Sequence, residues 1–202
     1  MIELKRDTFR RALQGVGAPP APRFYQMGAA VAVVLRFDEQ GGDPEVLLMR
    51  RVEHKGDPWS GHVSLPGGRA EPQDSSVAAT ATRETQEEVN LDLRRDAELV
   101  GHLPPTKPMI TLKLRPLHVS PVVYFATAPL APRAQDEAQR VFWLPLQQAH
   151  AGDLEGRHRY HLGPVSRVFP CWRYEGEVIW GLTLRVLRGL LARVERTGDA
   201  SI

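Results

Sequence analysis

The sequence predicts a mixed α/β fold, and two kinds of pattern along its 202 residues predict it. Apolar residues recur with helical spacing at both ends of the chain, over 2–14 and 177–194, and again in the middle, after Asp74. Short apolar runs of strand length stand between these segments, and the continuous run 29–37 is the clearest of them. The patterns alone therefore predict helices and strands mixed along one chain.

The N-terminal part begins with the predicted helix 2–14 and a Pro/Gly linker at 15–22. One side of this helix carries the apolar residues Ile2, Leu4, Phe9 and Leu13. A Gly-Gly-Asp-Pro turn at 41–44 separates the strand 29–37 from a second strand at 45–50. Further strands are predicted at 63–65, at 98–103, at 117–126 with a break at Pro121, at 139–144, and at 165–174 with an interruption at Pro170.

The central helix has a predicted start, two distinct sides and a predicted stop. Asp74 or Ser75 is expected to cap its free N–H groups, and Asn90 to end it in the left-handed conformation. At about 100° per residue, one stripe for packing on a sheet comprises Val77, Ala78, Ala81, Thr85 and Val89. The adjoining stripe holds Glu84, Glu87 and Glu88, of which Glu88 lies nearest the core.

These three glutamates are the most informative residues of the chain. Residues three and four apart share a helix face, so the acids of the segment RETQEE repel one another. A hard divalent cation turns that repulsion into binding, because Mg²⁺ takes oxygen ligands and bridges carboxylates to substrate phosphates. Gly67 and Gly68 allow the backbone to approach the same place closely. The alternative for an acidic helix is a solvated face.

The stretch 67–91 resembles the Nudix box, G-x5-E-x7-R-E-U-x-E-E-x-G-U, in which U is a bulky apolar residue. The residues that match are Arg83, Glu84, Glu87, Glu88 and Leu91. Thr85 replaces an apolar residue, and Asn90 replaces a glycine whose positive φ asparagine also tolerates. The distance from Gly68 to Arg83 is one residue longer than in the general pattern, which places Asp74 near the middle acid, with Glu71 before it.

That extra residue also occurs in the branch of the family that resembles coenzyme A pyrophosphatases. The chain is similar to this branch at Leu47, Leu48, Arg51, Gly61 and the run Pro66-Gly67-Gly68. It departs from the branch at Met49, Val52 and Leu65, and Gly56-Asp57 stands where a basic residue is expected.

The resemblance implies a Nudix-type α/β/α sandwich with a mixed β-sheet, and a site that binds Mg²⁺ or Mn²⁺. It implies Glu87 and Glu88 as the main metal ligands, Glu84 as a ligand or base, and the carbonyl of Gly67 as a backbone ligand. It implies that Arg83 orients the glutamates through charge-assisted hydrogen bonds. Asp74 and Glu71 are weaker candidates, and for Asp74 capping is an equal alternative.

Glu137 is a further candidate for the general base. It lies six residues before Trp143, and in several Nudix branches an acid on this late loop takes that role. The alternative is a solvated loop acid beside Asp136.

Basic and aromatic residues are candidates for binding the rest of a nucleotide. The basic candidates for the extra phosphates are Arg50, Arg51, Lys55, Arg69 and Lys107. Trp59 is a candidate for stacking on a base or lining the pocket, and a place in the core is its alternative. For the basic residues the alternative is a solvated surface.

Composition restricts the class of protein. The net charge of +2 is too small to predict nucleic acid as the main partner. A single cysteine, Cys171, excludes an internal disulfide, favours a reducing compartment, and is expected to be buried. The sequence has neither a secretory signal nor an apolar run long enough for a membrane span, so we expect a cytoplasmic protein.

Length favours one domain over residues 1–202, with a helix and linker at 1–22 and a core at 23–195. The aromatic C-terminal third is suited to a homodimer interface, but no feature of the sequence requires one.

Three functions are open at this point. The first is metal-dependent hydrolysis of a nucleoside diphosphate linked to another group, with coenzyme A as the preferred substrate and 3′,5′-ADP and 4′-phosphopantetheine as products. The second is a Nudix pyrophosphatase acting on ADP-ribose or nucleoside triphosphates, which the departures at 49, 52 and 56–57 favour. The third is a non-catalytic module that senses a nucleotide, against which the three intact glutamates argue.

Overall fold

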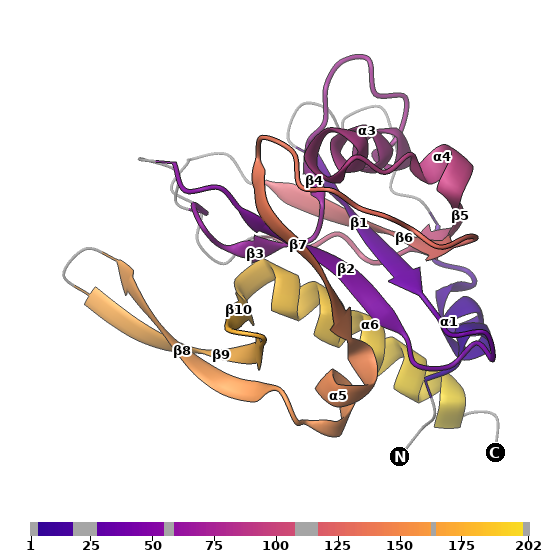
Figure 1. The fold of residues 1–202 in the computed structure, drawn as a ribbon. Coiled ribbons are helices and arrows are strands. Elements are labelled where there is room, and N and C mark those ends of the chain that lie inside the picture. The colour runs from indigo at the N-terminus through magenta and orange to yellow at the C-terminus, as the bar shows by residue number, and fades with distance from the viewer. Residues whose placement is uncertain (1–3, 18–27, 55–58, 108–116, 163–164, 200–202) are drawn as a thin grey trace.

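A computed structural model describes residues 4–17, 28–54, 59–107, 117–162 and 165–199. Helices cover a central mixed sheet, and a smaller sheet extends from one side of it (Figure 1). The predictions made for Ile2, for most of the linker 15–22, for Lys55 and for 56–57 lie outside the described residues.

The elements follow the chain in this order. The helices are α1 (Arg6–Leu13), α3 (Val77–Val89), α4 (Leu93–Asp96), α5 (Leu146–Ala151) and α6 (Gly181–Asp199). The strands of the large sheet are β1 (Gly28–Arg36), β2 (Glu45–Arg51), β3 (Val63–Ser64), β4 (Gly67–Arg69), β5 (Ala97–His102), β6 (His118–Ala126) and β7 (Ala138–Pro145). The strands of the small sheet are β8 (Glu155–Leu162), β9 (Val165–Tyr174) and β10 (Glu177–Trp180).

The large sheet is mixed, as the resemblance implied. Its strand order is β3-β2-β1-β6-β5, with β4 added to β1 and β7 added to β2. β1 and β6 run parallel over eight residue pairs, from Gly28 opposite His118 to Leu35 opposite Phe125, and the other pairings are antiparallel. The small sheet has the order β10-β9-β8.

Each face of the large sheet has its own core, because successive side chains of a strand point to opposite faces. From β1, Ala30, Ala32 and Val34 pack on one face in the core that contains the buried side of α3. Val33 and Leu35 pack on the other face with the buried residues of α1 and α6. Figure 1 shows α3 on one side of the sheet and α1 and α6 on the other. The predicted α/β/α sandwich is therefore confirmed.

The central helix α3 ends as predicted but is capped by a different residue. Ser76, and neither Asp74 nor Ser75, accepts a hydrogen bond from the N–H of Ala79, at 3.1 Å. Asp74 is instead used as an acceptor for Thr80 and Arg83 and for the N–H of Glu71. Asn90 has φ +54° and forms the left-handed stop.

Two prolines that were expected to interrupt strands lie within continuous strands. The carbonyl of Pro121 accepts from the N–H of Leu103, the residue that follows the end of β5. The nitrogen of Pro121, which has no hydrogen to donate, therefore points toward β5 and away from β1. The ladder to β1 thus loses no hydrogen bond. Pro170 lies where β10 has already ended opposite Cys171, so β9 has only β8 as a neighbour there. Proline is tolerated where a strand behaves as an edge.

The helix predicted over 177–194 begins at Gly181, because its first residues form β10. A tight turn with positive φ at Glu175 and Gly176 folds the chain back on β9, and Val178, Ile179 and Trp180 favour a strand. Cys171 is buried, as predicted. Within the described part of the chain, no helix has the length and apolar character that crossing a bilayer requires.

Candidate active site

A pocket of about 430 Å³ lies where α3, the β3–β4 segment and the start of α6 meet. Of the predicted site residues, those that line this pocket are Arg51, Trp59, Gly67, Arg69, Glu84, Glu88 and Glu137. The structure thus brings together an acidic group from α3 and the late loop, and basic and aromatic residues from β2, the segment after it, and β4.

Glu88 is the most buried acid of the site, with only 2% of its surface exposed. Its carboxylate accepts a hydrogen bond from the N–H of Gly67 at 2.8 Å, and Nη1 of Arg51 lies 3.5 Å from its other oxygen. Burial raises the pKa of Glu88 to about 8, and the nearby carboxylates of Glu84 and Glu137 act in the same direction. The surroundings of Glu88 therefore stabilise its charged form only in part.

Glu84 stands next to the glycine pair, which leaves room for its carboxylate. A Cβ added to Gly68 would lie 2.5 Å from all three carboxyl atoms of Glu84, so this position admits only glycine while the carboxylate remains there. Burial also raises the pKa of Glu84, although Arg83 lies 3.0 Å from its Oε1 and opposes the shift.

Arg83 holds the acids of this region together. Its guanidinium donates to both oxygens of Asp74, to Glu87 at 2.9 Å, and to the carbonyl of Arg69 at 3.0 Å. Burial works against the charge of Asp74, but the hydrogen bonds from Arg83, the Glu71 N–H and Thr80 hold its pKa below the usual value. Arg83 therefore has the contacts expected of a residue that orients the glutamates.

Glu87 differs from its two neighbours on α3. Its side chain is 57% exposed, pairs with Arg83, and does not line the pocket. The three acids that share one stripe of the helix thus divide into two that line the pocket and one that does not.

Glu137 reaches the pocket because its loop is attached to the end of α3. The N–H of Gln135 donates to the carbonyl of Glu88 at 3.0 Å, and the N–H of Val52 donates to the carbonyl of Glu137 at 3.0 Å. These bonds connect residues that are far apart in sequence and place Glu137 on the pocket lining, near Glu84 and Glu88.

Two predicted binding residues lie outside this pocket. Arg50 lines a neighbouring pocket and lies 3.6 Å from Glu177. Lys107 is exposed, and its carbonyl accepts a hydrogen bond from Arg185. Trp59 is 39% exposed and lines the pocket, so its alternative place in the core is wrong.

One wall of the pocket was not predicted. It consists of the aromatic rings of His62, Tyr160 and Trp180, with Tyr160 and Trp180 4.7 Å apart and His62 and Trp180 5.1 Å apart between ring centres. Tyr160 lay outside the predicted helices and strands, and Trp180 lay in a predicted helix. The available signal was the alternation of charged residues at 155, 157 and 159 with Gly156, His158 and Tyr160, which is typical of a strand.

The donor set fits a hard divalent cation. Among the described residues, no three His, Cys, Asp or Glu side chains form a ready-made cage. Mg²⁺ does not need one, because it keeps several waters and binds through one or two carboxylates and the phosphates of its substrate. Glu84 and Glu88 supply such carboxylates, of which the first is half-buried and the second is buried. The N–H of Gly67 contacts the carboxylate of Glu88. That the carbonyl of Gly67 binds the metal stays a prediction.

The shifted pKa of Glu88 predicts how the metal-free protein responds to pH. Because the folded-state pKa of about 8 exceeds the ordinary value of 4.5, the contribution of Glu88 to stability is fully present below about pH 4.5 and is lost as pH rises through 8. Glu88→Gln should remove this loss and stabilise the metal-free protein by on the order of 2 kcal/mol near pH 8.5, with little effect near pH 4.5. Urea unfolding in EDTA at both pH values measures the change in unfolding free energy that Glu88→Gln causes. An equal change at both pH values would contradict the prediction.

Comparisons with known proteins identify the family to which this α/β/α sandwich with a mixed sheet belongs. The NUDIX domain matches residues 27–163. NudL of Escherichia coli (strain SMS-3-5 / SECEC), an uncharacterized Nudix hydrolase, is 35% identical over 153 residues, covering 75% of this chain and 76% of NudL. NudL of Shigella boydii serotype 18 has the same identity and coverage. The chain therefore belongs to the Nudix hydrolase family.

Solved structures agree on the fold. The NUDIX domain of Shewanella oneidensis NrtR, solved in complex with ADP ribose, has a TM-score of 0.51 and 19% identity to this chain. The similarity covers 83% of this chain and 88% of that one.

Proposed function

We propose that this protein uses a divalent cation, Mg²⁺ or Mn²⁺, to hydrolyse a phosphoanhydride bond in a nucleoside diphosphate linked to another group. Coenzyme A is the proposed substrate, with 3′,5′-ADP and 4′-phosphopantetheine as products. The observation that carries the proposal is the group of Glu84, Glu88 and Glu137 on one pocket, where burial and mutual repulsion raise the pKa of the first two. Nudix hydrolases generally need divalent metal ions.

The acids have separate proposed roles. Glu88 and Glu84 would hold the cation, and Glu87 would join them when Arg83 releases it. The bound cation supplies charge neutralisation on the phosphates, a more acidic water and alignment of the two. Glu137, which faces the other acids from the opposite loop, takes a proton from the attacking water. Arg83 is a positioning residue that acts through the glutamates.

The reaction is a balanced hydrolysis. The oxygen of water bonds to one phosphorus, and the bond between that phosphorus and the bridging oxygen breaks. The bridging oxygen leaves with the other phosphate, so both products are phosphate monoesters. Arg51 and Arg69 line the pocket and are the proposed partners of the phosphate oxygens. Trp59, at the exposed margin of the pocket, is the proposed partner of the nucleobase.

The departures from the coenzyme A branch bear unequally on this proposal. Met49 is fully buried in the core beside α3 and does not line the pocket, so its identity is a matter of packing. Leu65 lines the pocket and is the departure that can alter substrate choice directly.

ADP-ribose is the second candidate substrate, because the NUDIX domain of NrtR was solved in complex with it. A nucleotide-sensing role without catalysis is the third, and the partly uncompensated charges of Glu84 and Glu88 argue against it. Location in the cytoplasm, a single domain over 1–202 and a homodimer stay predictions.

A product assay tests the proposal. The protein is incubated with Mg²⁺ or Mn²⁺ and, separately, with coenzyme A, acyl-coenzyme A, ADP-ribose, dinucleoside polyphosphates and nucleoside triphosphates, and the products are identified by mass spectrometry. We expect 3′,5′-ADP and 4′-phosphopantetheine from coenzyme A, with a higher kcat/KM than for the other classes and no turnover in EDTA. Preference for ADP-ribose would replace the substrate and keep the site, whereas no turnover of any compound would favour the sensing role.

A further inference from the structure

A second pocket of about 410 Å³ adjoins the first, behind the aromatic wall. The residues that line both pockets are His62, Val63, Tyr160 and Trp180, so a single layer of side chains separates them. A ligand that occupies both pockets therefore has to contact these shared side chains.

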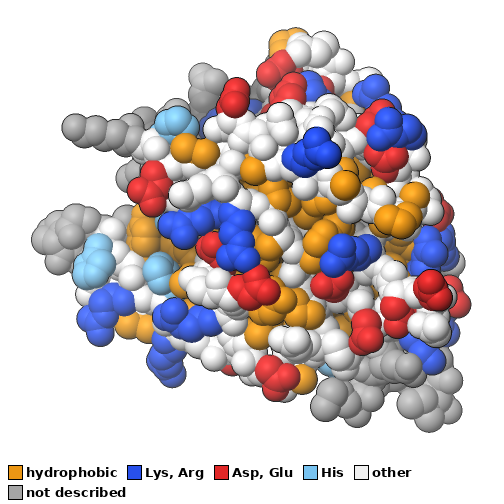
Figure 2. Space-filling view, viewed as in Figure 1, with side chains coloured by type: hydrophobic (Ala, Val, Ile, Leu, Met, Phe, Trp, Pro, Cys, Tyr) orange, Lys and Arg blue, Asp and Glu red, His pale blue; other side chains and the backbone are white. Residues whose placement is uncertain are grey.

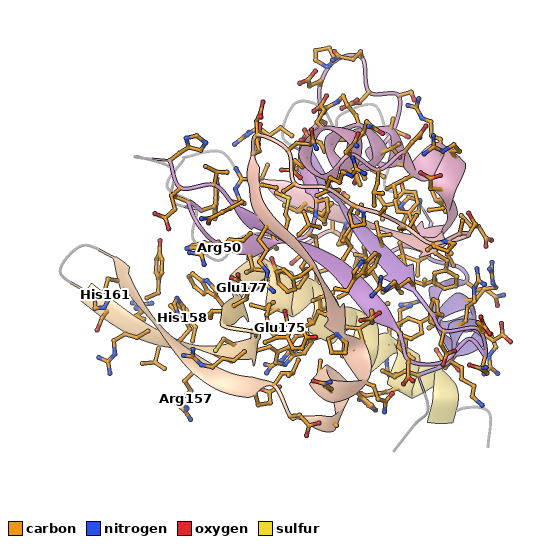
Figure 3. The ribbon with its side chains drawn as sticks, in the orientation of Figure 1. Arg50, Arg157, His158, His161, Glu175 and Glu177 are labelled. Carbon is orange, nitrogen blue, oxygen red and sulfur yellow. The ribbon has the colours of Figure 1, made fainter. Side chains whose placement is uncertain are left out.

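The second pocket is rich in basic groups. Arg50 from β2 and Arg159 from β8 line it, together with His62, His158 and His161. Figure 2 shows Lys or Arg and His side chains gathered on the face over the β8–β9 hairpin. In Figure 3, Arg50, His158 and Glu177 lie together at the base of this hairpin, and His161 lies farther out along β8.

Glu177 is the acid that lines this pocket, and it is already in use. Its side chain is 8% exposed and lies between two arginines, 3.3 Å from Arg140 and 3.6 Å from Arg50. Arg140 also pairs with Glu175 at 2.5 Å. The acid thus anchors the turn before β10 and leaves the mouth of the pocket basic.

Arg50 is held loosely enough to accept another partner. It lies 3.6 Å from Glu177 and 3.5 Å from Glu53, and both distances exceed the 2.7–2.9 Å of a charge-assisted hydrogen bond. Glu53 is 72% exposed, and an ion pair at such exposure contributes little to stability. An anion in the pocket would offer the guanidinium shorter, two-pronged bonds.

We propose that this second pocket, defined by Arg50, His158 and Arg159, is a subsite for a phosphate monoester on the ribose of the substrate's nucleotide, distinct from the diphosphate that is cleaved. The inference rests on the proposed function, because it assigns to one substrate both the acid-lined pocket and its basic neighbour. His158 serves as a neutral donor near pH 7, since burial and the nearby Arg173 lower its pKa. The side chains of Tyr160 and Trp180, which line both pockets, then lie beside the ribose that joins the two phosphate positions.

Binding of two nucleotides that differ by one phosphate tests the subsite without turnover. Titration calorimetry compares 3′,5′-ADP with 5′-AMP on wild type, Arg50→Gln, Arg159→Gln and the control Arg36→Gln. Arg36 is a matched control, because its side chain is 39% exposed against 36% for Arg50, and it also pairs with a glutamate. We expect wild type and the control to prefer 3′,5′-ADP by about tenfold or more. Arg50→Gln should reduce the preference to about twofold and leave 5′-AMP affinity unchanged.

The remaining outcomes separate this inference from the proposed function. Equal affinity of wild type for the two nucleotides, or a preference that survives in both pocket variants, would overturn the subsite. If Arg50→Gln fails to fold, loss of the preference in the exposed variant Arg159→Gln decides in favour, and its persistence there decides against. Turnover of coenzyme A and dephospho-coenzyme A at equal kcat/KM, with equal nucleotide affinities, would keep the proposed reaction and remove the subsite. A preference for 3′,5′-ADP without coenzyme A hydrolysis would keep the subsite and remove the proposed reaction.

Discussion

Glu88→Gln should lower kcat for coenzyme A hydrolysis by about 10³-fold, because a lost metal ligand removes several kcal/mol of transition-state stabilisation. Glu88 is the most buried acid of the pocket and receives the N–H of Gly67, so no other described carboxylate occupies an equivalent place. Steady-state kinetics at saturating Mg²⁺ and Mn²⁺ measure the effect.

The control for this variant is Glu45→Gln, which also removes an ion-paired carboxylate, but one that is 31% exposed and does not line the pocket. We expect its kcat to stay within about twofold of wild type, since surface pairs contribute little. Unchanged turnover in both Glu87→Gln and Glu88→Gln would contradict the assignment of the acids as metal ligands.

Gly67→Ala should destabilise the fold by about 3 kcal/mol or more, or prevent folding, because two penalties combine at this position. Gly67 has φ +148°, which an L-residue rarely adopts. A Cβ there would lie 2.2 Å from the carbonyl oxygen of Ala30 and 2.5 Å from the Cα of Val31, both in the backbone of β1. Thermal unfolding should show a loss of at least 6 °C, at about 2–4 °C per kcal/mol for a chain of this size.

Gly152→Ala is the matched control for backbone conformation alone. Gly152 has φ +90°, but a Cβ added to it meets nothing within 4 Å. We expect a cost of about 1–2 kcal/mol from the positive φ without any steric clash. Equal losses in the two variants would mean that β4 can move away from β1, and that the close approach of these strands does not fix the position of the Gly-Gly turn.

Local patterns predicted most of the architecture, because they depend on residues close together in sequence. The apolar run at 29–37 became β1, the spacing of the central helix placed Glu88 nearest the core, and Asn90 was recognised as its left-handed stop. The same patterns were ambiguous at 177–180, where β-branched and aromatic residues fit a strand or the first turn of a helix. The turn at Glu175 and Gly176 decides this, through contacts with β9.

The shape of the pocket depends on contacts that a sequence pattern does not contain. Glu137 reaches Glu88 because Gln135 binds the carbonyl at the end of α3, a contact between residues 47 positions apart (135 − 88). Tyr160 and Trp180 form a wall with His62 because β8 and β10 both pair with β9. Exposure also separates Glu87 from its neighbours, although all three acids share one helical stripe.

The most direct test of the account is the binding of Mn²⁺ to wild type and to Glu88→Gln, measured by titration calorimetry without substrate at pH 8.5. We expect wild type to bind Mn²⁺ with release of protons, because the raised pKa leaves Glu88 partly protonated before the metal arrives. We expect Glu88→Gln to bind Mn²⁺ at least about tenfold more weakly and to release fewer protons. Equal affinity and equal proton release in the two proteins would contradict the claim that the buried glutamate of α3 holds the metal.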